Sequence, residues 1–505
     1  MNEPCVLGTL PVVEKPNPAI GVPPSRWAGL ARFPRAQQSL PVPAIAVLYL
    51  SLPSLAVLLL VRLLHVVPHG FVNLEMLLIG AAGMFMPRGV VFLLLALDAL
   101  ADCAYSICYT YQFSPGDLID SLRYAILLPA GRLAAGCIAL AAAIFACALL
   151  AEVRPRRDRR LHAACTLLAL VAILLPIDVL GGQNPLWHRD MSLLSVRVAR
   201  SPLLTLGVRA LLAHRIEQAA RGPDPPMASA SAQLKLAMGT FGADAQTPDV
   251  VLVVVESWGL LLDADVQRAL TAPYRQDAIA RGYRVTYGTA PFSGLTVPGE
   301  ARELCQSALG FGILHRSAQV AQQCLPSQFH ALGYENTAIH GYVGEMFHRA
   351  AWYPELGFDR TWFGPELRRL GLPPCEGAFP GICDAAIAKF IGGALLDDGR
   401  PRPKFIYWVT LNSHLPVPAQ PNLPADNWCA AEPALRDSAA LCSWFRLVRT
   451  VHESVSQIAA QTTRPTVFIL VGDHAPPFSE ARLRSQFSAA QVPYVMLTPV
   501  SQPMR

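Results

Sequence analysis

The sequence predicts a protein in two parts: five transmembrane helices, then an α/β domain built around a mostly parallel sheet. Of the 505 residues, 52% are hydrophobic and 15% are charged, and the mean hydropathy is +0.34. A soluble domain is typically about 25% charged. The apolar excess lies in the first part of the chain, whereas short β-branched runs alternate with helical stretches after residue 248. We therefore expect part of the chain to lie in a lipid bilayer.

Five apolar segments account for the membrane part. They cover residues 41–64, 68–86, 89–111, 121–151 and 162–182. Each approaches the roughly 20 residues that a helix needs to cross a bilayer. We expect residues 1–40 to form a separate segment before a transmembrane domain at residues 41–182.

Basic residues predict the orientation of these helices. Residues 1–40 carry four Lys or Arg residues, and residues 154–160 read R-P-R-R-D-R-R, whereas residues 112–120 carry no basic residue. By the positive-inside rule residues 1–40 and residues 154–160 are cytoplasmic. Five crossings then place everything after residue 182 outside the cytoplasm.

Charge elsewhere in the chain points to few partners. The net charge is only +5, and no basic stripe with interleaved aromatic residues is present, so we expect no nucleic-acid binding.

Asp98 and Asp102 lie one turn apart in the third span, and Arg132 lies in the fourth. Charges inside a membrane are functional candidates, so a transporter or channel is one alternative. An ion pair that joins these helices is the simpler interpretation.

Residues 183–248 form a connecting region. Residues 201–220 have apolar positions at helical spacing, which suits a helix in the membrane interface or one packed on the following domain. Residues 222–232 read G-P-D-P-P-M-A-S-A-S-A and are interpreted as a linker.

Cysteine spacing supports an exported domain after this linker. Half of the 12 cysteines lie there, as three pairs close in sequence: Cys305 and Cys324, Cys375 and Cys383, and Cys429 and Cys442. An even number in an exported domain predicts disulfides, and short loops favour pairing between nearest neighbours. Zinc sites or free thiols are the alternative, but no C-x-x-C pair supports zinc.

Residues 249–505 contain five apolar runs typical of buried parallel strands. The runs are residues 250–255, 337–340, 404–411, 466–471 and 493–497. Four of them end in polar groups that could bind a ligand: Glu256-Ser257, His340-Gly341, Asn412-Ser413-His414 and Gly472-Asp473-His474. Ligands of open α/β sheets bind beyond the carboxyl ends of the strands, so we expect these side chains to meet at one edge.

A metal site follows from the chemistry of these groups. Glu256, Asp473 and His474 are suitable ligands for Zn²⁺ or Mn²⁺, with one position left open. A cation there would activate a nearby hydroxyl, and the candidates are Thr286, Thr289, Ser293 and Thr296. Residues 294–300 fit a turn into a helix whose N-terminus would attract phosphate. Composition alone does not choose among the four hydroxyls.

The ordered motifs V-V-V-E-S, a turn Thr, H-G, L-N-S-H and G-D-H, behind five spans, resemble the sulfatase-fold phosphotransferases of the alkaline phosphatase superfamily. Lipoteichoic acid synthase and the phosphoglycerol and phosphoethanolamine transferases share this layout. The resemblance covers nearly the whole chain, most specifically residues 249–499. It implies a multi-pass protein of a bacterial-type inner (cell) membrane with a periplasmic or extracytoplasmic sulfatase-like domain.

The resemblance also implies roles for individual residues. Thr296 matches the nucleophile and fourth metal ligand, and His414 matches the acid that protonates the leaving group. The residues matching a head-group site are His340, Phe347 and Arg349. We interpret two other histidines, His348 and His452, as ordinary surface residues.

The reaction implied is metal-dependent transfer of a phospholipid head group to a cell-envelope glycan or lipid through a phosphothreonine intermediate. The E-S-W sequence resembles the phosphoglycerol transferases, whereas paired external cysteines are typical of phosphoethanolamine transferases, so the donor stays open. A hydrolase of sulfuric esters or phosphodiesters is an alternative, although residues 296–300 (T-V-P-G-E) lack the C/S-x-P-x-R motif of sulfatases that form formylglycine. A catalytically inactive binding module is another alternative.

Overall fold

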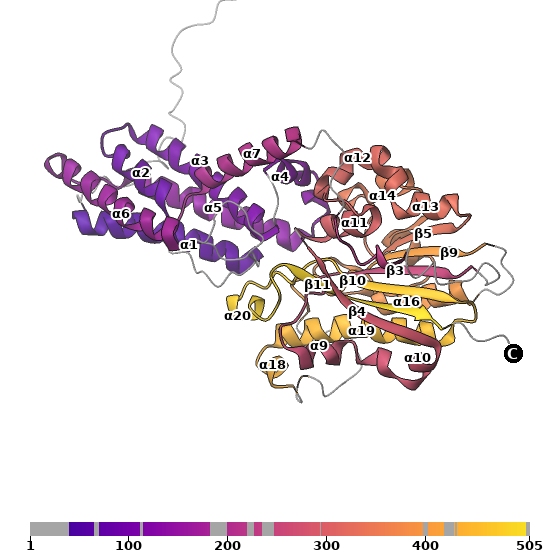
Figure 1. Ribbon diagram of the computed structural model, residues 1–505. Coiled ribbons are helices and arrows are strands. Elements are labelled where there is room, and N and C mark those ends of the chain that lie inside the picture. The colour runs from indigo at the N-terminus through magenta and orange to yellow at the C-terminus, as the bar shows by residue number, and fades with distance from the viewer. Residues whose placement is uncertain are drawn as a thin grey trace, which may run out of the picture.

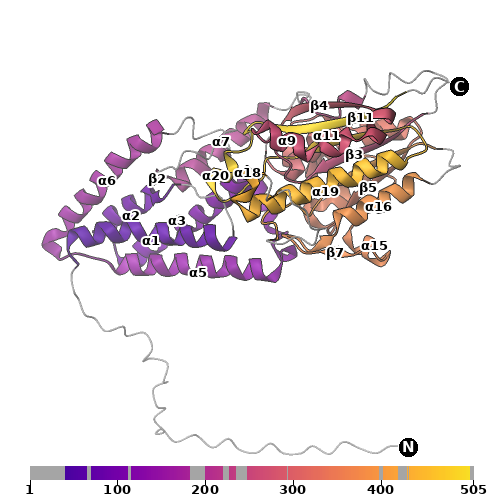
Figure 2. The same ribbon diagram turned by 90° about the horizontal axis from the view of Figure 1, so that it is seen from below.

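The computed structural model describes residues 40–64, 70–111, 115–181, 199–219, 227–234, 247–292, 294–396, 402–418, 429 and 432–500. A group of helices lies at one end of the molecule and an α/β part at the other (Figures 1 and 2). The predicted segment 1–40 before its last residue, linker residues 222–226 and the hydroxyl candidate Ser293 lie outside the described residues.

Helices occur at all five predicted spans. They are α1 (Val42–Leu64), α2 (Leu74–Gly83), α3 (Arg88–Tyr111), α5 (Ala130–Glu152) and α6 (Arg160–Gly181), and Figure 2 shows them side by side. Within the described residues, three stretches are long and apolar enough to cross a membrane: Arg88–Thr110, Ala130–Glu152 and Arg157–Pro176. Exposed Leu93, Ile138 and Ile173 on these helices suit contact with lipid.

The second span differs from the prediction. Helix α2 has 10 residues, about 15 Å of helix and half of a bilayer core, so residues 68–86 do not form one continuous spanning helix. It begins where the Asn73 side chain accepts hydrogen bonds from the amides of Glu75 and Met76, at 3.0 and 3.1 Å. The count of five full-length spanning helices is therefore not confirmed.

An ion pair does form inside the helical part, but not with the predicted partner. Arg200 follows α6 in the sequence, and its Nε lies 2.8 Å from Asp102 Oδ1. The neighbouring aspartate is bound separately, because Asn73 Nδ2 donates to Asp98 Oδ2 at 2.8 Å. Arg132 instead lies over the ring of Phe379, at 5.5 Å from its centroid. The pairing of Arg132 with the two aspartates was wrong because Arg132, near the start of α5, faces the α/β part.

This ion pair fixes the helix that follows it. Helix α7 (Pro202–Ala219) lies where the sequence predicts a helix at residues 201–220. The amides of Leu203 and Leu204 in its first turn donate to the Glu75 carboxylate, at 2.8 and 2.9 Å. A carboxylate at a helix N-terminus is stabilising, so α7 is anchored to the helices of the membrane part.

The α/β part is built on a mixed sheet. In the described residues it has seven strands in the order β4 (Tyr283–Pro291), β11 (Gln491–Pro499), β10 (Thr466–Gly472), β3 (Asp249–Val255), β9 (Lys404–Val409), β5 (Glu335–His340) and β6 (Arg360–Trp362). The strands from β10 to β6 are parallel, whereas β11 is antiparallel to both of its neighbours. All five predicted strands are present and β4 and β6 are additional, but the strand predicted at residues 493–497 (β11) is antiparallel and not parallel.

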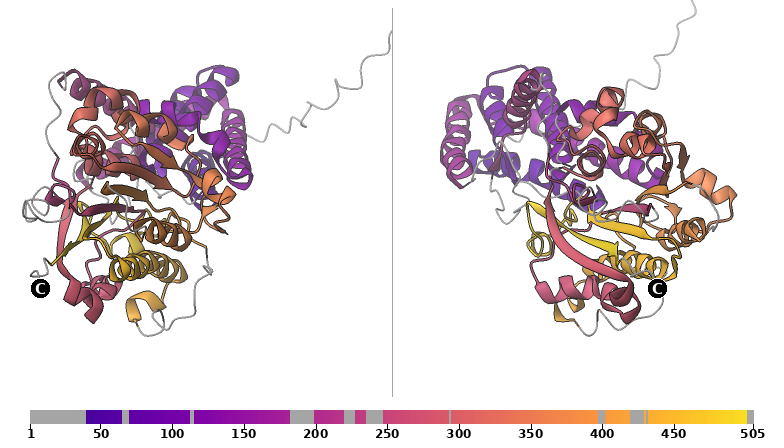
Figure 3. Two further views of the ribbon diagram at one scale, coloured as in Figure 1. Left: turned by 90° about the vertical axis from the view of Figure 1, so that its right-hand side faces the viewer. Right: turned by 45° about the vertical axis from the view of Figure 1, so that its right-hand side comes forward.

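Two helical layers cover this sheet (Figures 1 and 3). One face carries α11 (Thr296–Cys305), α12 (Ile313–Val320), α13 (Leu325–Ala331) and α14 (Arg349–Glu355). The other carries α16 (Asp384–Leu395) and α19 (Ala439–Gln461), with α9 (Ala264–Leu270) and α10 (Asp277–Gly282) beside them. Every residue of β3 and β10 is buried, as expected for central strands covered on both sides.

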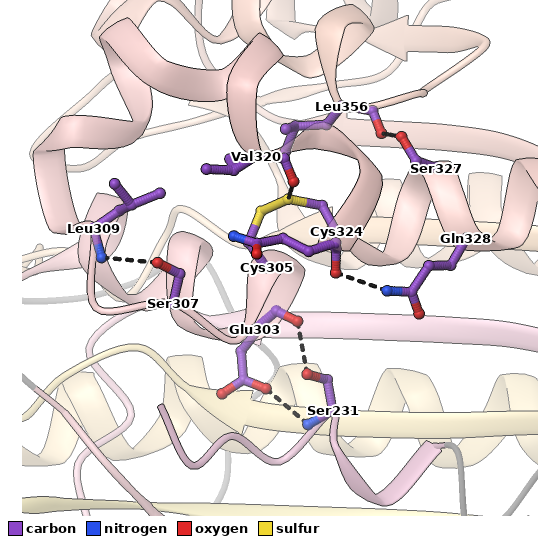
Figure 4. Close-up of a disulfide and its surroundings, with 11 residues drawn as sticks. Ser231, Glu303, Cys305, Ser307, Leu309, Val320, Cys324, Ser327, Gln328 and Leu356 are labelled. Atoms are coloured by element: carbon purple, nitrogen blue, oxygen red, sulfur yellow. Dashed lines mark hydrogen bonds between the residues drawn. A yellow bond between two sulfur atoms is a disulfide. The ribbon is translucent and has the colours of Figure 1, made fainter. Parts of the chain in front are cut away.

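The three predicted disulfides are confirmed: Cys305–Cys324, Cys375–Cys383 and Cys429–Cys442. Figure 4 shows the first, which joins the end of α11 to the residue before α13. It braces the helix that carries the candidate nucleophile.

Residues 227–234 do not behave as a plain linker. The amide of Ser231 donates to Glu303 Oε2 at 2.9 Å, and its hydroxyl donates to the Glu303 carbonyl at 2.6 Å (Figure 4). Ala230 and Leu234 are buried in the core of the α/β part. The prediction of a linker is wrong for residues 227–232, because these contacts fix the segment on α11.

Candidate active site

Glu256 stands at the carboxyl end of β3 and is held by its neighbours. Its backbone amide donates to Thr410 Oγ1 at 2.9 Å, and its carbonyl accepts from the Ser413 hydroxyl at 2.6 Å. The Ser257 hydroxyl donates to Glu256 Oε1 at 2.7 Å. Ser257 has a φ of 55°, a strained value for a residue other than glycine, and such strain clusters at functional sites.

Asp473 and His474 follow β10 and face the same point. Asp473 Oδ1 accepts the amides of Ser257 and His474, both at 2.7 Å. His474 Nδ1 donates to the Ala475 carbonyl at 2.9 Å. Its Nε2 is therefore directed to Asp473 Oδ2 and Glu256 Oε1, at 3.3 and 3.4 Å. A backbone bond of this kind fixes the tautomer that a metal-binding histidine needs.

The three side chains fit a divalent cation. Their ligand atoms lie within 4.8 Å of one another, and all three residues are buried. Asp473 Oδ2 and His474 Nε2 have no hydrogen-bond partner, which is rare for buried polar atoms. Two carboxylates and an imidazole suit both Zn²⁺ and Mn²⁺.

Protonation without a cation supports the same fit. Burial and the charge of Glu256 raise the pKa of Asp473 to about 8. Burial disfavours charged His474, but Asp473 and Glu256 outweigh it and raise its pKa to about 9. Burial also opposes ionisation of Glu256, yet His414 and His474 hold the pKa of that carboxyl well below its usual range. The raised pKa values of Asp473 and His474 thus favour bound protons at the point where a divalent cation would balance the two carboxylates.

Among the hydroxyl candidates that the structure describes, Thr296 contacts one of these ligands directly. Its Oγ1 donates to Glu256 Oε2 at 2.9 Å, and it is the first residue of α11, where no side chain caps the helix. Thr286 and Thr289 instead lie in β4 and pair with Met496 and Pro493 of β11. The geometry favours Thr296 among the described candidates.

Two glycines allow close packing on the metal-ligand segment, and Gly299 is the one that lies in α11. A Cβ at Gly299 would lie 2.9 Å from the Cβ of Asp473, and one at Gly472 would lie 1.8 Å from the Trp258 carbonyl oxygen. Both distances are shorter than any side chain tolerates. The backbone of the helix that carries Thr296 therefore packs directly on Asp473.

Arg302 is a buried residue that the sequence analysis missed. Its Nη2 donates to the Gly472 carbonyl at 2.7 Å, and its Nη1 donates to the Asp473 carbonyl at 3.2 Å. Its Nε is 2.6 Å from Glu303 Oε1. Arg302 thus joins α11 to the segment that carries two candidate ligands, and Glu303 on the same helix binds Ser231. An arginine two turns into a polar helix gave no signal in the sequence beyond its charge.

Arg349, matched to a phosphate-binding arginine, is paired inside the protein. Its Nη2 and Nε lie 2.7 and 3.0 Å from Glu300 Oε1. Glu300 Oε2 accepts the hydroxyls of Tyr353 and Tyr407, at 2.5 and 3.2 Å. The guanidinium is buried, so its charge is largely balanced by Glu300. The role of Arg349 toward a substrate stays a prediction.

The remaining candidates border the ligands. His340 Nδ1 donates to the Val409 carbonyl at 3.1 Å, and burial together with Arg349 lowers the pKa of His340 to about 3. His414 Nδ1 donates to the Leu415 carbonyl at 2.7 Å, and burial lowers its pKa. Both imidazoles are therefore neutral at pH 7. Phe347 lies against the Arg349 guanidinium, at 5.4 Å from its ring centroid.

Asp384 at the start of α16 is a further missed residue. Its Oδ2 accepts the amides of Leu411 and Asn412, at 3.1 and 2.7 Å, while its own amide donates to Asn412 Oδ1 at 2.7 Å. This pair fixes the segment that presents His414. The asparagine of L-N-S-H was visible in the sequence, but its partner was not.

One histidine left aside in the sequence analysis is not on the surface. His452 is 0% exposed; its Nδ1 lies 3.0 Å from the Tyr274 hydroxyl, and its ring packs edge-on against Trp258 at 4.3 Å. It lies on the buried face of the amphipathic helix α19. His348 is partly buried and lies beside Tyr124 of the helical part, at 5.4 Å between rings.

Comparison with known families identifies the family of the α/β part. The family model described as "Sulfatase" matches residues 248–503, which is half of the chain. The chain belongs to the sulfatase family. The resemblance inferred from the motifs is thereby confirmed, and the sulfatase domain coincides with the mixed sheet and its covering helices.

The curated relative of this sulfatase-family chain is distant. A curated protein of Rhizobium meliloti (strain 1021), named for a provisional assignment to cyclic beta-1,2-glucan modification, is 30% identical over 160 residues. The match covers 31% of this chain and 24% of that relative, so about a quarter of the relative's length is shared.

Similar solved structures include three bacterial proteins. The lipoteichoic acid synthase LtaP from Listeria monocytogenes is 12% identical, with a TM-score of 0.38 over 54% of this chain and 72% of that one. The Streptococcus pyogenes phosphoglycerol transferase GacH, in complex with sn-glycerol-1-phosphate, is 14% identical, with a TM-score of 0.36 over 53% and 73%. The zinc complex of the periplasmic domain of Escherichia coli EptC is 13% identical, with a TM-score of 0.33 over 55% and 77%.

Proposed function

We propose that this sulfatase-family chain transfers the phosphorylated head group of a membrane phospholipid to a hydroxyl of a cell-envelope glycan or lipid. The observation that carries the proposal is the 2.9 Å hydrogen bond from Thr296 to Glu256, beside the unpartnered ligand atoms of Asp473 and His474. A hydroxyl, a divalent-cation site and a helix N-terminus meet at one point, which is the arrangement for nucleophilic attack on phosphorus. The apolar helices supply access to a lipid donor.

The reaction has two balanced steps. Thr296 Oγ1 attacks the phosphorus of the donor, the bond to the diacylglycerol oxygen breaks, and the head-group phosphoryl stays on Thr296. The acceptor hydroxyl then attacks the same phosphorus, which forms the new phosphodiester and regenerates the threonine. A divalent cation held by Glu256, Asp473, His474 and Thr296 would lower the pKa of the hydroxyl and neutralise charge on the phosphoryl oxygens.

Neighbouring side chains have distinct tasks in these steps. Glu256 orients the Thr296 oxygen by accepting its hydrogen bond. Neutral His414, whose Nδ1 proton is engaged by a carbonyl, has Nε2 to take up the proton that leaves Thr296 Oγ1 and to pass it to the departing diacylglycerol oxygen. Neutral His340 has its Nε2 left to accept a hydrogen bond from a head-group hydroxyl or ammonium. Arg349 and Phe347 border the head group.

The donor and acceptor are proposed as classes. Phosphatidylglycerol and phosphatidylethanolamine both fit a site with a neutral acceptor at His340. The glycan class of acceptor is supported by the Rhizobium meliloti relative, which is named for glucan modification. We place the protein in a bacterial-type inner membrane with the sulfatase domain outside the cytoplasm, as the arginine-rich loop at residues 154–160 indicates.

Head-group release tests the proposal. The full-length protein is incubated with phosphatidylglycerol or phosphatidylethanolamine labelled in the head group, and diacylglycerol is quantified. Thr296→Ala should lower release by several orders of magnitude, while Thr289→Ala, on β4, should change it less than threefold. Normal release by Thr296→Ala would refute the covalent mechanism, and release of neither head group by the wild type would refute the donor class.

A further inference from the structure

A short segment of the helical part contacts residues that border the active site. Residues 123–129 connect α4 (Pro115–Leu122) to α5 and include the single turn η2 (Ala125–Leu127). The hydroxyl of Tyr342, two residues after His340, donates to the Leu127 carbonyl at 2.6 Å. The ring of Tyr124 packs edge-on against Phe347, at 5.4 Å between centroids. Two residues bordering the site are thus backed by the membrane part.

Arg132 extends this contact toward His414. Its guanidinium carbon lies 5.5 Å from the centroid of the Phe379 ring, which in turn packs edge-on against the His414 imidazole at 4.7 Å. Its positive charge acts on two residues beside the site. It contributes to lowering the pKa of His414, and it partly offsets the rise in the pKa of Tyr342 that burial causes. One aromatic ring therefore separates this cation from the candidate acid.

The positive potential that Arg132 adds beside His414 suits an anionic donor. The Arg349 guanidinium is balanced by Glu300 at 2.7 Å. A divalent cation would be balanced by the carboxylates of Glu256 and Asp473. A phosphodiester brings one further negative charge into a buried site, where an unbalanced charge is costly. Arg132 is partly exposed at the start of α5, where the helix N-terminus adds positive potential.

We propose that Arg132 binds the anionic phosphodiester of the lipid donor, so that the donor site is assembled from the membrane part and the sulfatase domain together. This inference rests on the proposed function. The donor then lies between Arg132 and the candidate ligands, with its diacylglycerol toward the helices. A guanidinium suits this contact because it can form two parallel hydrogen bonds with phosphate oxygens while stacked on an aromatic ring.

Steady-state kinetics of the full-length protein in detergent test this assignment. Dioctanoyl-phosphatidylglycerol and dioctanoyl-phosphatidylethanolamine serve as donors, and bis(p-nitrophenyl) phosphate serves as a soluble phosphodiester. Arg132→Gln should raise KM for the lipid at least tenfold and leave kcat within threefold, and Arg132→Lys should fall between the variant and the wild type. Arg159→Gln, in the arginine-rich loop, is the matched control and should not change KM.

The outcomes separate this inference from the proposed function. An unchanged KM in Arg132→Gln, or a fall in kcat at constant KM, overturns the assignment of Arg132. If the wild type releases no lipid head group, the proposed donor fails, and KM for bis(p-nitrophenyl) phosphate decides the role of Arg132 by the same tenfold criterion. Full metal content of Arg132→Gln, or of Arg132→Lys if the first variant does not fold, shows that the sulfatase domain is intact.

Discussion

The hydroxyl of Thr296 lies 2.9 Å from Glu256 Oε2, although 40 positions separate the two residues in the sequence. Thr296 begins helix α11, and Glu256 directly follows strand β3. The contact depends on Gly299, which lets α11 approach the segment that carries Asp473. A candidate nucleophile is thereby placed against a candidate metal ligand by packing that leaves no room for a side chain.

Removing any one ligand should remove the metal. Glu256→Gln, Asp473→Asn and His474→Gln each take away a donor from a buried set of three, so we expect less than a tenth of the Zn²⁺ or Mn²⁺ content of the wild type and no turnover. Elemental analysis of the purified proteins measures this. Asp265→Asn changes an exposed carboxylate and should keep full metal. Full metal content in all three ligand variants would show that the ligands were wrongly assigned.

Arg302 should act on the metal through the backbone. Arg302→Lys keeps the charge but cannot reach the carbonyls of Gly472 and Asp473 together. Loss of such a supporting contact typically weakens metal affinity about 10–100-fold. Titration of the metal-free protein with Zn²⁺ measures the change, with Arg268→Lys, on the exposed face of α9, as the control. Equal affinities for the two variants would contradict a positioning role.

Buried His452 should make stability depend on pH. Burial lowers its pKa to about 3, whereas in the unfolded chain it returns to about 6.5. The unfolded state then gains a proton as pH falls below 6.5 and the folded state does not, so stability is complete above that pH and decreases toward pH 3. Between pH 7.5 and pH 5.5, one such histidine lowers the free energy of unfolding by about 1.4 kcal/mol.

Thermal unfolding at these two pH values checks this expectation. The wild type should lose more in Tm on acidification than His452→Gln does, and His162→Gln, at an exposed site, should behave as the wild type. An equal loss in the wild type and in His452→Gln would show that this histidine does not carry the effect.

Orientation in the membrane can be tested with a reporter that is active only outside the cytoplasm. Alkaline phosphatase fused after residue 219, at the end of α7, should be active, whereas a fusion after residue 157, in the arginine-rich loop, should not. Activity measurements in whole cells give the result. The reverse pattern would place the sulfatase domain in the cytoplasm and separate it from an external acceptor.

The parts of the fold with a strong local pattern were predictable from the sequence. Strands β3 and β10 are buried throughout and appear as unbroken apolar runs, so the groups that follow them were found. Strand β6 has three residues, too few to form a pattern, and β4 is largely half-exposed. The span predicted at residues 68–86 was longer than helix α2, because the start of this helix depends on Asn73 and not on hydropathy.

The supporting contacts of the site could not be read from local sequence. Arg302 and the Asp473 carbonyl are 171 positions apart, and Asp384 binds amides 27 and 28 positions away. Such pairs exist only once the sheet order has brought distant strand ends together. The same is true of Arg132, whose partner Phe379 belongs to the other part of the chain.

The central claim is that Thr296 carries the head group between donor and acceptor. Mass spectrometry of peptides tests it most directly, after the full-length protein is incubated with phosphatidylglycerol or phosphatidylethanolamine without an acceptor and quenched in acid. We expect an adduct of phosphoglycerol or phosphoethanolamine on Thr296, absent from Thr296→Ala and from Asp473→Asn. Turnover of the donor without any adduct on Thr296, or with the adduct on another residue, would contradict the account.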